Sequence, residues 1–496
     1  MSARRLFAAL AARPADALAL RCDMDEWSTG RLLAAIDALL PRLAACRVLA
    51  VLADNGPAWA VADLAALRNG TVHLPLPTFF SDAQLRHALS ETATDVVLSD
   101  QPERILGLNL GFVVAGEWLG LRWLQREIAP ASLPSGTAKI SFTSGSSGAA
   151  KGVCLSMAGL LDTAAALHQS LGQLPIERHL AVLPLALLLE NSAGLYAPLL
   201  RGAEVHLPSL ASLGWRGMAG FDPAALQQAV IRSRPQSLIL VPELLKAWVM
   251  YLQATDQQAP EHLCYIAVGG ARVAPELLRR ARALGLPAYQ GYGLTECGSV
   301  VSLNRPGDDG DDVGRPLPHV QVRIVDGEVR IGSRAFLGYL GAVASGAAGS
   351  QRLEFPTGDL GVIDSDGHLH LAGRSKNLLI TSFGRNIAPE WVEAALLAQP
   401  AIAQAVVSGD ARPWLNGLLV AASGCGDDAL AAAVEAANQT LPDYARLGGW
   451  LPVPPFTPQN GQATGNGRPI RNTILEYHAA AIAALYQNEE TAHVFL

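Results

Sequence analysis

The sequence predicts an α/β protein with a large N-terminal domain, residues 1–375, and a small α+β C-terminal domain, residues 376–496. Helical and strand patterns alternate through residues 1–305, which is typical of layered α/β folds. From about Val320 the pattern changes to short β-rich pieces with turns at Asp326-Gly327 and Asp366-Gly367, which predict hairpins. Near Lys376 the pattern changes again, and Pro389 stands in the first turn of a new predicted helix.

The periodicity of apolar residues predicts the individual elements in order. Ser81 and Gln84 form a capping box, which marks the start of a helix. Helices are predicted over residues 29–43, 59–69, 81–90, 275–284 and 390–397. Strands are predicted over residues 48–52, 95–98, 179–183, 237–241, 265–268, 320–325, 328–331, 361–363, 368–371, 405–407 and 417–422. Residues 459–467, rich in Gly, Asn and Gln, are expected to form a mobile link.

Composition narrows the class of protein. The chain has 496 residues, half of them hydrophobic, which is enough for a deep core. A net charge of −7 without a basic tract argues against nucleic acid as a partner. The N-terminus lacks the apolar core of a signal peptide, and no apolar run is long enough for an integral membrane segment, so we expect a cytoplasmic protein. The six cysteines lack C-x-x-C spacing and are expected to be reduced.

The segment from Ile140 to Val153 predicts a strand that continues into a hydroxyl-rich loop ending on a lysine. Glycines let backbone N–H groups approach a ligand, hydroxyls add donors, and the ammonium adds charge, which together suit a phosphate group. Lysine is rare in this chain. Of the 37 Lys and Arg residues, the lysines are only Lys139, Lys151, Lys246 and Lys376, and the rest are arginines. The predicted phosphate loop consists of Thr143, Ser144, Gly145, Ser146, Ser147, Gly148 and Lys151.

Two other nucleotide-binding interpretations of this loop fail on the spacing of their motifs. A Walker A loop fails because Ala150 precedes the lysine and Gly152 follows it. The dinucleotide fingerprint fails at its nearest match, where Glu296 takes the place of the third glycine. An ordinary surface loop and a Ser-Ser-Lys amidase site both remain open on this segment alone.

Five motifs in order resemble the acyl-adenylate-forming enzymes, which include acyl-CoA synthetases, peptide-synthetase adenylation domains and beetle luciferases. They are Phe142–Val153, Gln290–Glu296, Thr357–Asp359, Gly373-Arg374, and Asn460-Gly461 followed by Arg468–Arg471. The segment from Thr381 to Glu390 is most similar to the fatty acyl-CoA synthetase branch. The resemblance implies an AMP-binding N-terminal domain with a β-barrel-like part, and a C-terminal domain that swings about a hinge at Lys376.

The resemblance also implies roles for individual residues. The loop with Lys151 would hold the β- and γ-phosphates of ATP, Thr295 the α-phosphate and Glu296 a Mg²⁺ ion, a cation that prefers oxygen ligands. Tyr292 would stack on adenine, Asp359 would accept the ribose hydroxyls and Arg374 would contact ribose or phosphate. Further nucleotide contacts are expected from Gly270, Ala271, Gln290, Gly291 and Gly293. Acyl-substrate contacts are expected from Leu187, Glu190, Asn191, Val241, Gly269 and Gly293.

Two positions depart from the pattern of the family. The late motif of these enzymes ends in a lysine that bridges the substrate carboxylate and the α-phosphate, and Arg468 stands there. Arginine keeps the charge but has a planar head, so the loss of one preorganised contact raises the barrier by roughly 3–4 kcal/mol. Leu187 stands where related synthetases often carry a histidine or aromatic gate, and the surrounding leucines favour an apolar acid.

The sequence therefore predicts an AMP-forming ligase that activates a fatty or other apolar acid with Mg²⁺ and ATP. The acyl group would pass to a thiol, either CoA or the phosphopantetheine of a separate acyl carrier protein. A second interpretation is an ATP- or acyl-adenylate-binding protein weakened by Arg468, and a third is the Ser/Lys amidase.

Overall fold

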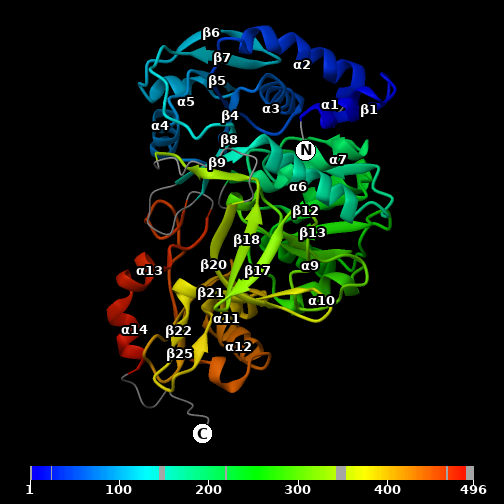
Figure 1. The fold of residues 1–496 in the computed structure, drawn as a ribbon. Helices are drawn as coiled ribbons and strands as arrows, with labels where there is room; N and C mark the ends of the chain where they lie inside the picture. The colour runs from blue at the N-terminus through cyan, green and yellow to red at the C-terminus, as the bar shows by residue number, and fades with distance from the viewer. Residues whose placement is uncertain are drawn as a thin grey trace. The chain divides into compact units, whose positions relative to one another are not determined.

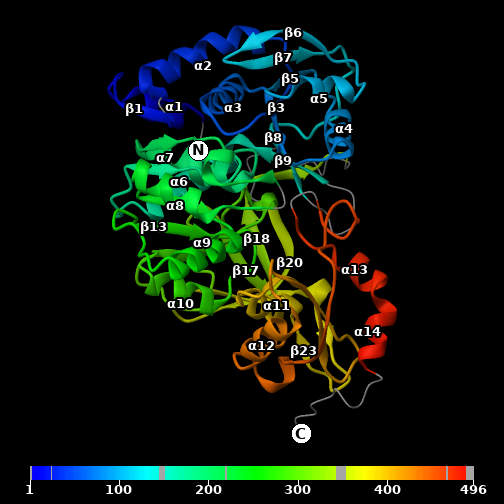
Figure 2. The same cartoon turned by 180° about the vertical axis from the view of Figure 1, so that it is seen from behind.

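The computed structural model describes residues 3–23, 25–143, 151–217, 220–341, 353–464 and 467–486. Figures 1 and 2 show the fold from opposite sides. The chain divides into two compact units. The first unit comprises Met1–Gly270, Leu284–Arg323 and Arg330–Phe355, and the second comprises Ala271–Ala283, Ile324–Val329 and Pro356–Leu496. The second unit thus takes in residues on both sides of Lys376, and the sequence boundary at that lysine stays a prediction.

The first unit contains an eight-stranded mixed sheet in the order β19-β9-β8-β4-β3-β5-β7-β6. Its strands are β3 (Val48–Leu52), β4 (Val72–Pro75), β5 (Val96–Ser99), β6 (Val113–Trp118), β7 (Leu121–Gln125), β8 (Thr137–Thr143), β9 (Lys151–Ser156) and β19 (Phe336–Tyr339). Strands β3, β4, β5 and β8 are parallel, whereas β9, β19, β7 and β6 join antiparallel. The sheet therefore has a parallel centre with antiparallel strands at both edges.

Helices pack on both faces of this sheet, as the side chains of β3 show. Leu49 and Val51 belong to the same core cluster as α2 (Thr29–Leu43) and α3 (Pro57–Asn69). The other residues of β3, Val48, Ala50 and Leu52, belong to another cluster with α4 (Asp82–Glu91) and α5 (Pro102–Gly107). Successive side chains of a strand point to opposite faces, so a strand covered on both sides is apolar throughout.

A nine-stranded sheet also lies in the first unit, in the order β16-β15-β14-β13-β12-β10-β11-β1-β2. Its strands are β1 (Leu18–Cys22), β2 (Asp25–Ser28), β10 (Arg178–Leu180), β11 (Glu204–His206), β12 (Ser237–Leu240), β13 (Tyr265–Val268), β14 (Ala288–Tyr292), β15 (Ser302–Leu303) and β16 (Arg315–Pro316). The six strands from β14 to β1 in this order are parallel. The accompanying helices are α1 (Ala3–Ala11), α6 (Met157–Ser170), α7 (Ala197–Arg201), α8 (Pro223–Ser233) and α9 (Pro242–Ala254).

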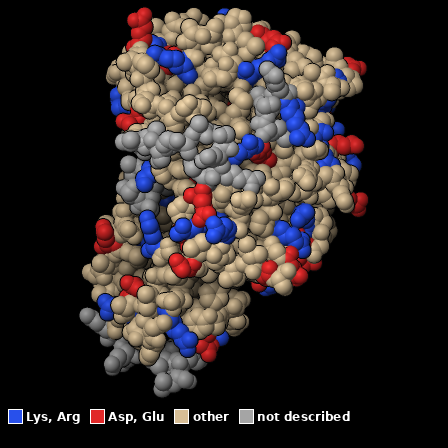
Figure 3. All heavy atoms as spheres, in the orientation of Figure 1, with Lys and Arg blue, Asp and Glu red and all other residues tan. Residues whose placement is uncertain are grey.

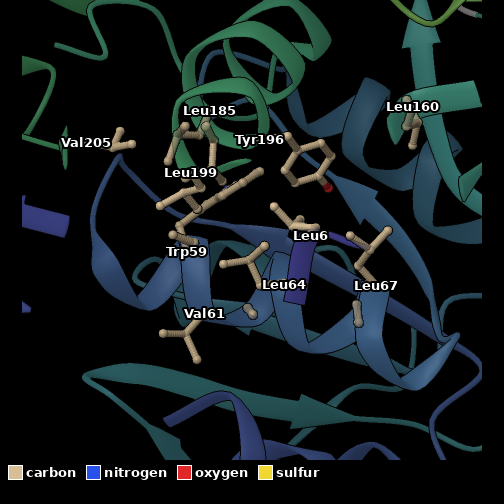
Figure 4. Packing of buried hydrophobic residues seen from close by; sticks show 14 of the residues in the cluster. Leu6, Trp59, Val61, Leu64, Leu67, Leu160, Leu185, Tyr196, Leu199 and Val205 are labelled. Atoms are coloured by element: carbon tan, nitrogen blue, oxygen red, sulfur yellow. The ribbon is translucent and has the colours of Figure 1, made fainter. Parts of the chain in front are cut away.

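A large apolar cluster joins helices of the first unit. In Figure 4, Trp59 and Leu64 of α3 point toward Leu199 of α7 and Leu6 of α1. These four side chains are almost fully buried. Burial of one such side chain contributes about 1.5–3 kcal/mol, so the cluster is a major source of stability. It includes residues from positions 6 to 335, and therefore ties distant parts of the chain together.

The second unit is built around a three-stranded sheet in the order β24-β25-β26, with β24 (Ile402–Ser408), β25 (Leu415–Ala421) and β26 (Leu447–Pro452). Val407 and Leu419 pack with α11 (Pro389–Leu397) and α12 (Asp427–Asn438), while Val406 and Leu418 pack with Ile474 of α13 (Arg471–Tyr477). The unit also has α10 (Pro275–Ala283), α14 (Ala479–Leu485) and the hairpin β22 (Leu379–Ile380) and β23 (Asn386–Ile387). A further sheet has the order β17-β18-β20-β21, with β17 (Gln321–Val325), β18 (Glu328–Ser333), β20 (Leu353–Ile363) and β21 (Leu369–Arg374).

Most predicted elements with a strong local signal are present. Helix α2 has the predicted bounds, and both hydrogen bonds of the Ser81–Gln84 capping box form. The predicted strand over residues 179–183 ends early, at Leu180. Side chains occupy the backbone groups of Leu183, because Asn55 donates to its carbonyl and Glu190 accepts from its N–H. Those groups are therefore unable to extend a strand ladder.

Two features of the described residues concern membranes and surface charge. No helix among them is both long enough and apolar enough to cross a membrane. On the face drawn in Figure 3, basic and acidic side chains are interspersed, without a broad area of either sign.

The six cysteines are free thiols. Cys46, Cys154 and Cys297 are buried, and the other three are half-buried.

Candidate active site

Several predicted contact residues follow the carboxyl ends of neighbouring parallel strands. Val241 follows β12, Gly269 follows β13, and Tyr292 is the last residue of β14, with Gly293 directly after it. In open α/β sheets, ligands bind outside the carboxyl ends of parallel strands. The fold thus brings residues separated by about fifty positions to one edge of the nine-stranded sheet.

The predicted phosphate loop connects two paired strands. Strand β8 ends at Thr143, β9 begins at Lys151, and these two residues are directly opposite each other in the antiparallel ladder. The positions of both ends are therefore fixed by the sheet. The predicted contacts Ser144, Gly145, Ser146, Ser147 and Gly148 lie outside the described residues.

A tight turn after β14 carries Thr295 and Glu296 on the short 3₁₀ helix η4 (Thr295–Cys297). A Cβ on Gly293 would lie 1.6 Å from the carbonyl oxygen of Ser299, so only glycine fits there. Ser299 itself has φ 95°, a left-handed conformation that is unfavourable for a residue with a side chain. Strained backbone of this kind is found most often at functional sites, and here it adjoins the predicted Mg²⁺ ligand.

Tyr339 of β19 links Lys151 to Glu296. Its hydroxyl donates a hydrogen bond of 2.9 Å to Oε1 of Glu296, and the Lys151 Nζ lies 5.4 Å from the centre of its ring. The geometry suits a cation–π contact. The sequence analysis missed Tyr339, and its Phe-Leu-Gly-Tyr segment offers no signal for this contact because Lys151 is 188 positions away.

The segment predicted to contact the acyl substrate forms a π-helix, η1 (Glu190–Tyr196). Glu190 is fully buried, and its carboxylate accepts from the N–H of Leu183 at 3.0 Å and lies 3.0 Å from Nε2 of His179. Burial raises the pKa of Glu190, and the hydrogen bond from His179 opposes that rise. The side chain thus takes part in a buried polar network within the first unit.

Asn191 lies in a second buried network. Its amide donates to Asp63 at 3.1 Å, and its oxygen accepts from Lys139. The Lys139 Nζ is also 2.6 Å from Asp63 Oδ1 and 3.0 Å from the hydroxyl of Tyr196, while His73 Nδ1 is 2.6 Å from the same Asp63 oxygen. Burial acts to raise the pKa of Asp63, but the charges of Lys139 and His73 lower it overall. Burial lowers the pKa of Lys139.

Apolar atoms lie near the remaining predicted acyl contacts. A Cβ built on Gly269 would lie 3.9 Å from Cδ2 of Leu189 and 3.6 Å from the carbonyl oxygen of Gly291. Leu187, Leu189 and Val241 are half-buried. These positions offer hydrocarbon surface and backbone groups at the same sheet edge.

Asp359 and Arg374 meet within the second unit. They are opposite partners on β20 and β21, and Arg374 Nε lies 3.0 Å from Asp359 Oδ1. The Thr357 hydroxyl supports this position by accepting from the N–H of Asp359 and donating to the carbonyl of Val329. Gly358 between them has φ +71°, which requires a residue without a side chain.

Other predicted residues of this unit are exposed. Ala271 is its first residue, and Lys376 lies in the short 3₁₀ helix η5 (Ser375–Asn377). Arg468 is exposed, and its backbone N–H and carbonyl both bond to Thr464. The predicted link 459–467 includes hydrogen-bonded turns, since Asn460 Oδ1 accepts from the N–H of Thr457.

Arg471 anchors the segment that carries Arg468. Its guanidinium is 2.6 and 2.7 Å from the two carboxylate oxygens of Glu393 on α11 and donates to the carbonyl of Val407 on β24. Both side chains of the ion pair are largely buried. Both oxygens of Glu393 accept from Nη2, while Nη1 bonds Val407, so the guanidinium is held in two directions and α13 begins at a defined place.

The described residues contain no cluster of three or more His, Cys, Asp or Glu side chains that would hold a metal ion. Glu296 still fits the requirement for Mg²⁺, which is commonly held by one or two carboxylates together with substrate phosphates. The strained turn and the hydrogen bond from Tyr339 fix the orientation of this carboxylate.

Sequence comparison assigns the class of protein. The model of AMP-binding enzymes matches residues 7–333, and the model of the C-terminal domain of AMP-binding enzymes matches residues 376–490. The chain therefore belongs to the AMP-binding enzyme family, which confirms the predicted resemblance.

Individual relatives agree with this assignment. The chain is 34% identical over 256 residues to the long-chain-fatty-acid–CoA ligase FadD15 of Mycobacterium bovis, over 46% of this chain and 42% of that protein. It is 32% identical over 291 residues to the 2-succinylbenzoate–CoA ligase of Bacillus velezensis, over 56% of each. The aligned region thus spans about half the length of these relatives.

A solved structure shows that the fold is shared along nearly the whole chain. The O-succinylbenzoate coenzyme A synthetase of Bacillus subtilis, in complex with AMP, has a TM-score of 0.74 at 21% identity. The match covers 95% of this chain and 98% of that one, which confirms the predicted α/β architecture with a smaller C-terminal part.

Proposed function

We propose that this protein is an ATP-dependent carboxylate:thiol ligase that forms AMP. A carboxylate oxygen of the acid attacks the α-phosphorus of ATP, the bond from that phosphorus to the oxygen bridging the β-phosphate breaks, and pyrophosphate leaves. The sulfur of a thiol then attacks the acyl carbon, the thiol proton is released, and AMP leaves. Both steps move negative charge, so catalysis of this kind depends on fixed positive and hydrogen-bonding groups.

The observation that carries this proposal is the arrangement of Lys151, Tyr339 and Glu296 at the end of the phosphate loop. Lys151 provides a compact charge for the β- and γ-phosphates, and Glu296 provides an oxygen ligand for Mg²⁺. Bound Mg²⁺ would neutralise charge on the phosphates as pyrophosphate leaves. Thr295, next to Glu296 on η4, is proposed to donate its hydroxyl to the α-phosphate.

In the second unit we propose that Asp359 accepts the ribose hydroxyls and Arg374 contacts ribose or phosphate. Arg468 takes the role of the family lysine on the substrate carboxylate and α-phosphate. Lys376 is proposed as the hinge. The paired geometry of Asp359 and Arg374, and the anchoring of the Arg468 segment through Arg471, support defined positions for these groups.

The proposed substrate is a fatty or other apolar acid. Leu187, Leu189 and Val241 provide apolar surface, and Gly269 leaves space beside them. Glu190 is an unfavourable receptor for the amino group of an amino acid, because its carboxylate is engaged by His179 and Leu183. A relative named for long-chain fatty acids supports an apolar chain, whereas another is named for the dicarboxylate 2-succinylbenzoate.

For the thiol, CoA is the first candidate, because the relatives are named as CoA ligases. The phosphopantetheine of a separate carrier protein is the alternative. The test is a pyrophosphate-release assay with fatty, aryl and hydroxy acids, each with CoA and with holo carrier protein. Acid-dependent formation of AMP and pyrophosphate supports the proposal, and its absence across the panel contradicts it.

Arg468 favours one further candidate, a protein that binds ATP or an acyl-adenylate with little turnover. Such a protein would bind Mg·ATP tightly in calorimetry while releasing pyrophosphate only at a trace rate. The amidase interpretation requires hydrolysis without ATP, so a strict dependence of turnover on ATP would exclude it.

A further inference from the structure

Tyr339 contacts two groups of opposite charge at once. Its hydroxyl hydrogen-bonds Glu296 Oε1 at 2.9 Å, and its ring lies 5.4 Å from the Lys151 ammonium. A direct ion pair between Lys151 and Glu296 would neutralise both groups. The tyrosine instead contacts Glu296 with its hydroxyl and Lys151 with the face of its ring.

The ring is held from several sides. Tyr339 of β19 lies opposite Val153 of β9 in the ladder between these strands. Val153 is two residues after Lys151 on β9. Phe336 packs against it edge-on, with ring centroids 5.1 Å apart. Gly338, with φ +135°, lets the strand bend immediately before Tyr339. The side chain therefore has a defined position relative to Lys151.

A second close contact fixes Glu296 relative to the same strand. Ala335, just before β19, packs closely against Gly159 and Gly298. A Cβ added to Gly159 would lie 2.2 Å from the Cα of Ala335, and a Cβ added to Gly298 would lie 3.0 Å from its Cβ. Gly298 directly follows η4, which carries Glu296. The distance from Tyr339 to Glu296 is therefore set by backbone packing on both sides.

The hydroxyl acts as the donor in its contact with Glu296. A phenol hydroxyl can donate, whereas a carboxylate oxygen accepts, so the 2.9 Å contact directs the Tyr339 hydroxyl at Oε1 of Glu296.

We propose that Tyr339 is a positioning residue, which orients Glu296 for a divalent cation through its hydroxyl and places the Lys151 ammonium for phosphate through its ring. This inference rests on the proposed function. The two contacts are separable: Tyr339→Phe removes the hydroxyl and keeps the ring, whereas Tyr339→Leu removes both. Tyr265→Phe is the matched control, since the Tyr265 hydroxyl donates to the backbone carbonyl of Asn304 instead of a carboxylate.

The direct measurement is Mn²⁺ binding by paramagnetic resonance in the presence of α,β-methylene-ATP, which cannot be cleaved between the α- and β-phosphates. We expect Tyr339→Phe to weaken the apparent Mn²⁺ affinity at least about tenfold, the typical effect of one lost hydrogen bond to a charged group. Its affinity for the nucleotide at saturating Mn²⁺ should change less than about twofold. Tyr339→Leu should also weaken nucleotide binding, and Tyr265→Phe should change neither constant.

The same variants are compared in turnover, with Mg²⁺ titrated at saturating ATP and acid. A positioning role predicts a higher Mg²⁺ requirement for Tyr339→Phe, with kcat recovering at high Mg²⁺. A purely structural role predicts a lower melting temperature with an unchanged Mn²⁺ constant, which would overturn the inference while leaving the proposed function intact. Failure of the wild-type protein to bind the nucleotide with Mn²⁺ would overturn both.

Discussion

Arg374 Nε lies 3.0 Å from Asp359 Oδ1, across two antiparallel strands of the second unit. The aspartate is almost fully buried, with a side chain 8% exposed, whereas the arginine side chain is 54% exposed. Each residue is a proposed contact for the nucleotide, and here each serves as a partner of the other. The pair therefore restricts the orientation of the carboxylate.

Replacement of the exposed partner should affect binding more than folding. Arg374→Gln is expected to lower stability by about 1 kcal/mol, because the glutamine amide can still donate to the buried Asp359 in place of the exposed arginine. Its KM for ATP should rise about tenfold, because a charged contact to the nucleotide is lost. Thermal unfolding and pyrophosphate-release kinetics measure the two effects. A large loss of stability with an unchanged KM would contradict the assigned role.

Arg468 decides between an efficient and a weakened adenylating enzyme. Arg468→Ala should lower kcat for pyrophosphate release at least about a hundredfold if arginine is the working residue, since one preorganised contact is worth roughly 3–4 kcal/mol. Arg468→Lys should raise activity at least about tenfold if the native protein is weakened by its planar head. A protein whose activity is indifferent to both changes does not use position 468.

Arg471 should act on stability, in contrast to Arg468 three residues earlier. Arg471→Met leaves the buried Glu393 without its partner and should destabilise the second unit by about 3 kcal/mol. The matched control Arg385→Met changes an exposed arginine of the same unit and should cost less than about 0.5 kcal/mol. Urea unfolding followed by tryptophan fluorescence tests this, since Trp391 and Trp450 pack in the core of that unit.

The buried Lys139 should be needed mainly because Asp63 is buried beside it. Lys139→Met removes the ammonium and is expected to cost about 3–5 kcal/mol, the usual effect of breaking a buried ion pair from one side. Adding Asp63→Asn should recover a large part of that loss, because the remaining group is then uncharged. A double variant no more stable than Lys139→Met would show that the ion pair is not the source of the cost.

Glu204 should make the first unit sensitive to acid. Burial opposes ionisation of Glu204, but hydrogen bonds from His206 and Arg21 lower its pKa to about 2. A carboxyl group with a pKa below its unfolded value of about 4.3 stabilises the fold above that pH, and the stabilisation is lost as the pH falls toward 2. The loss attributable to this group is about 3 kcal/mol.

Urea midpoints measured between pH 5 and pH 2 test this dependence. Glu204→Gln should be less stable than the wild-type protein at pH 5 and should lose less stability on acidification. Glu261→Gln, a change at an exposed position, should follow the wild-type curve. Parallel curves for Glu204→Gln and the wild-type protein would contradict the assignment.

Predictions from the sequence were most accurate for features that depend on residues close together in the chain. The capping box at Ser81 and the helix Thr29–Leu43 depend on residues a few positions apart, and both are present. The five motifs likewise lie in short segments, and their family is confirmed. The roles of the individual motif residues stay predictions.

Long-range partners explain what the sequence could not predict. Glu190 and Asn191 were expected to contact the substrate, but their described partners include His179, Lys139 and Asp63, which are 11, 52 and 128 positions away. A π-helix changes the direction of successive side chains, and no periodicity in the segment signalled it. Tyr339 was missed for the same reason, because its partners Lys151 and Glu296 lie on β9 and η4, far away in the sequence.

Strand β9 lies between β8 and β19, so two ladders hold the backbone around Lys151. Paired strands therefore fix the backbone of Lys151 on both sides, and they also fix Thr143 at the other end of the seven-residue loop. The loop between Thr143 and Lys151 can therefore be replaced while both of its ends keep their positions in the sheet. Loops taken from other members of the family could be inserted there to alter how tightly the β- and γ-phosphates are held, while the lysine stays in register.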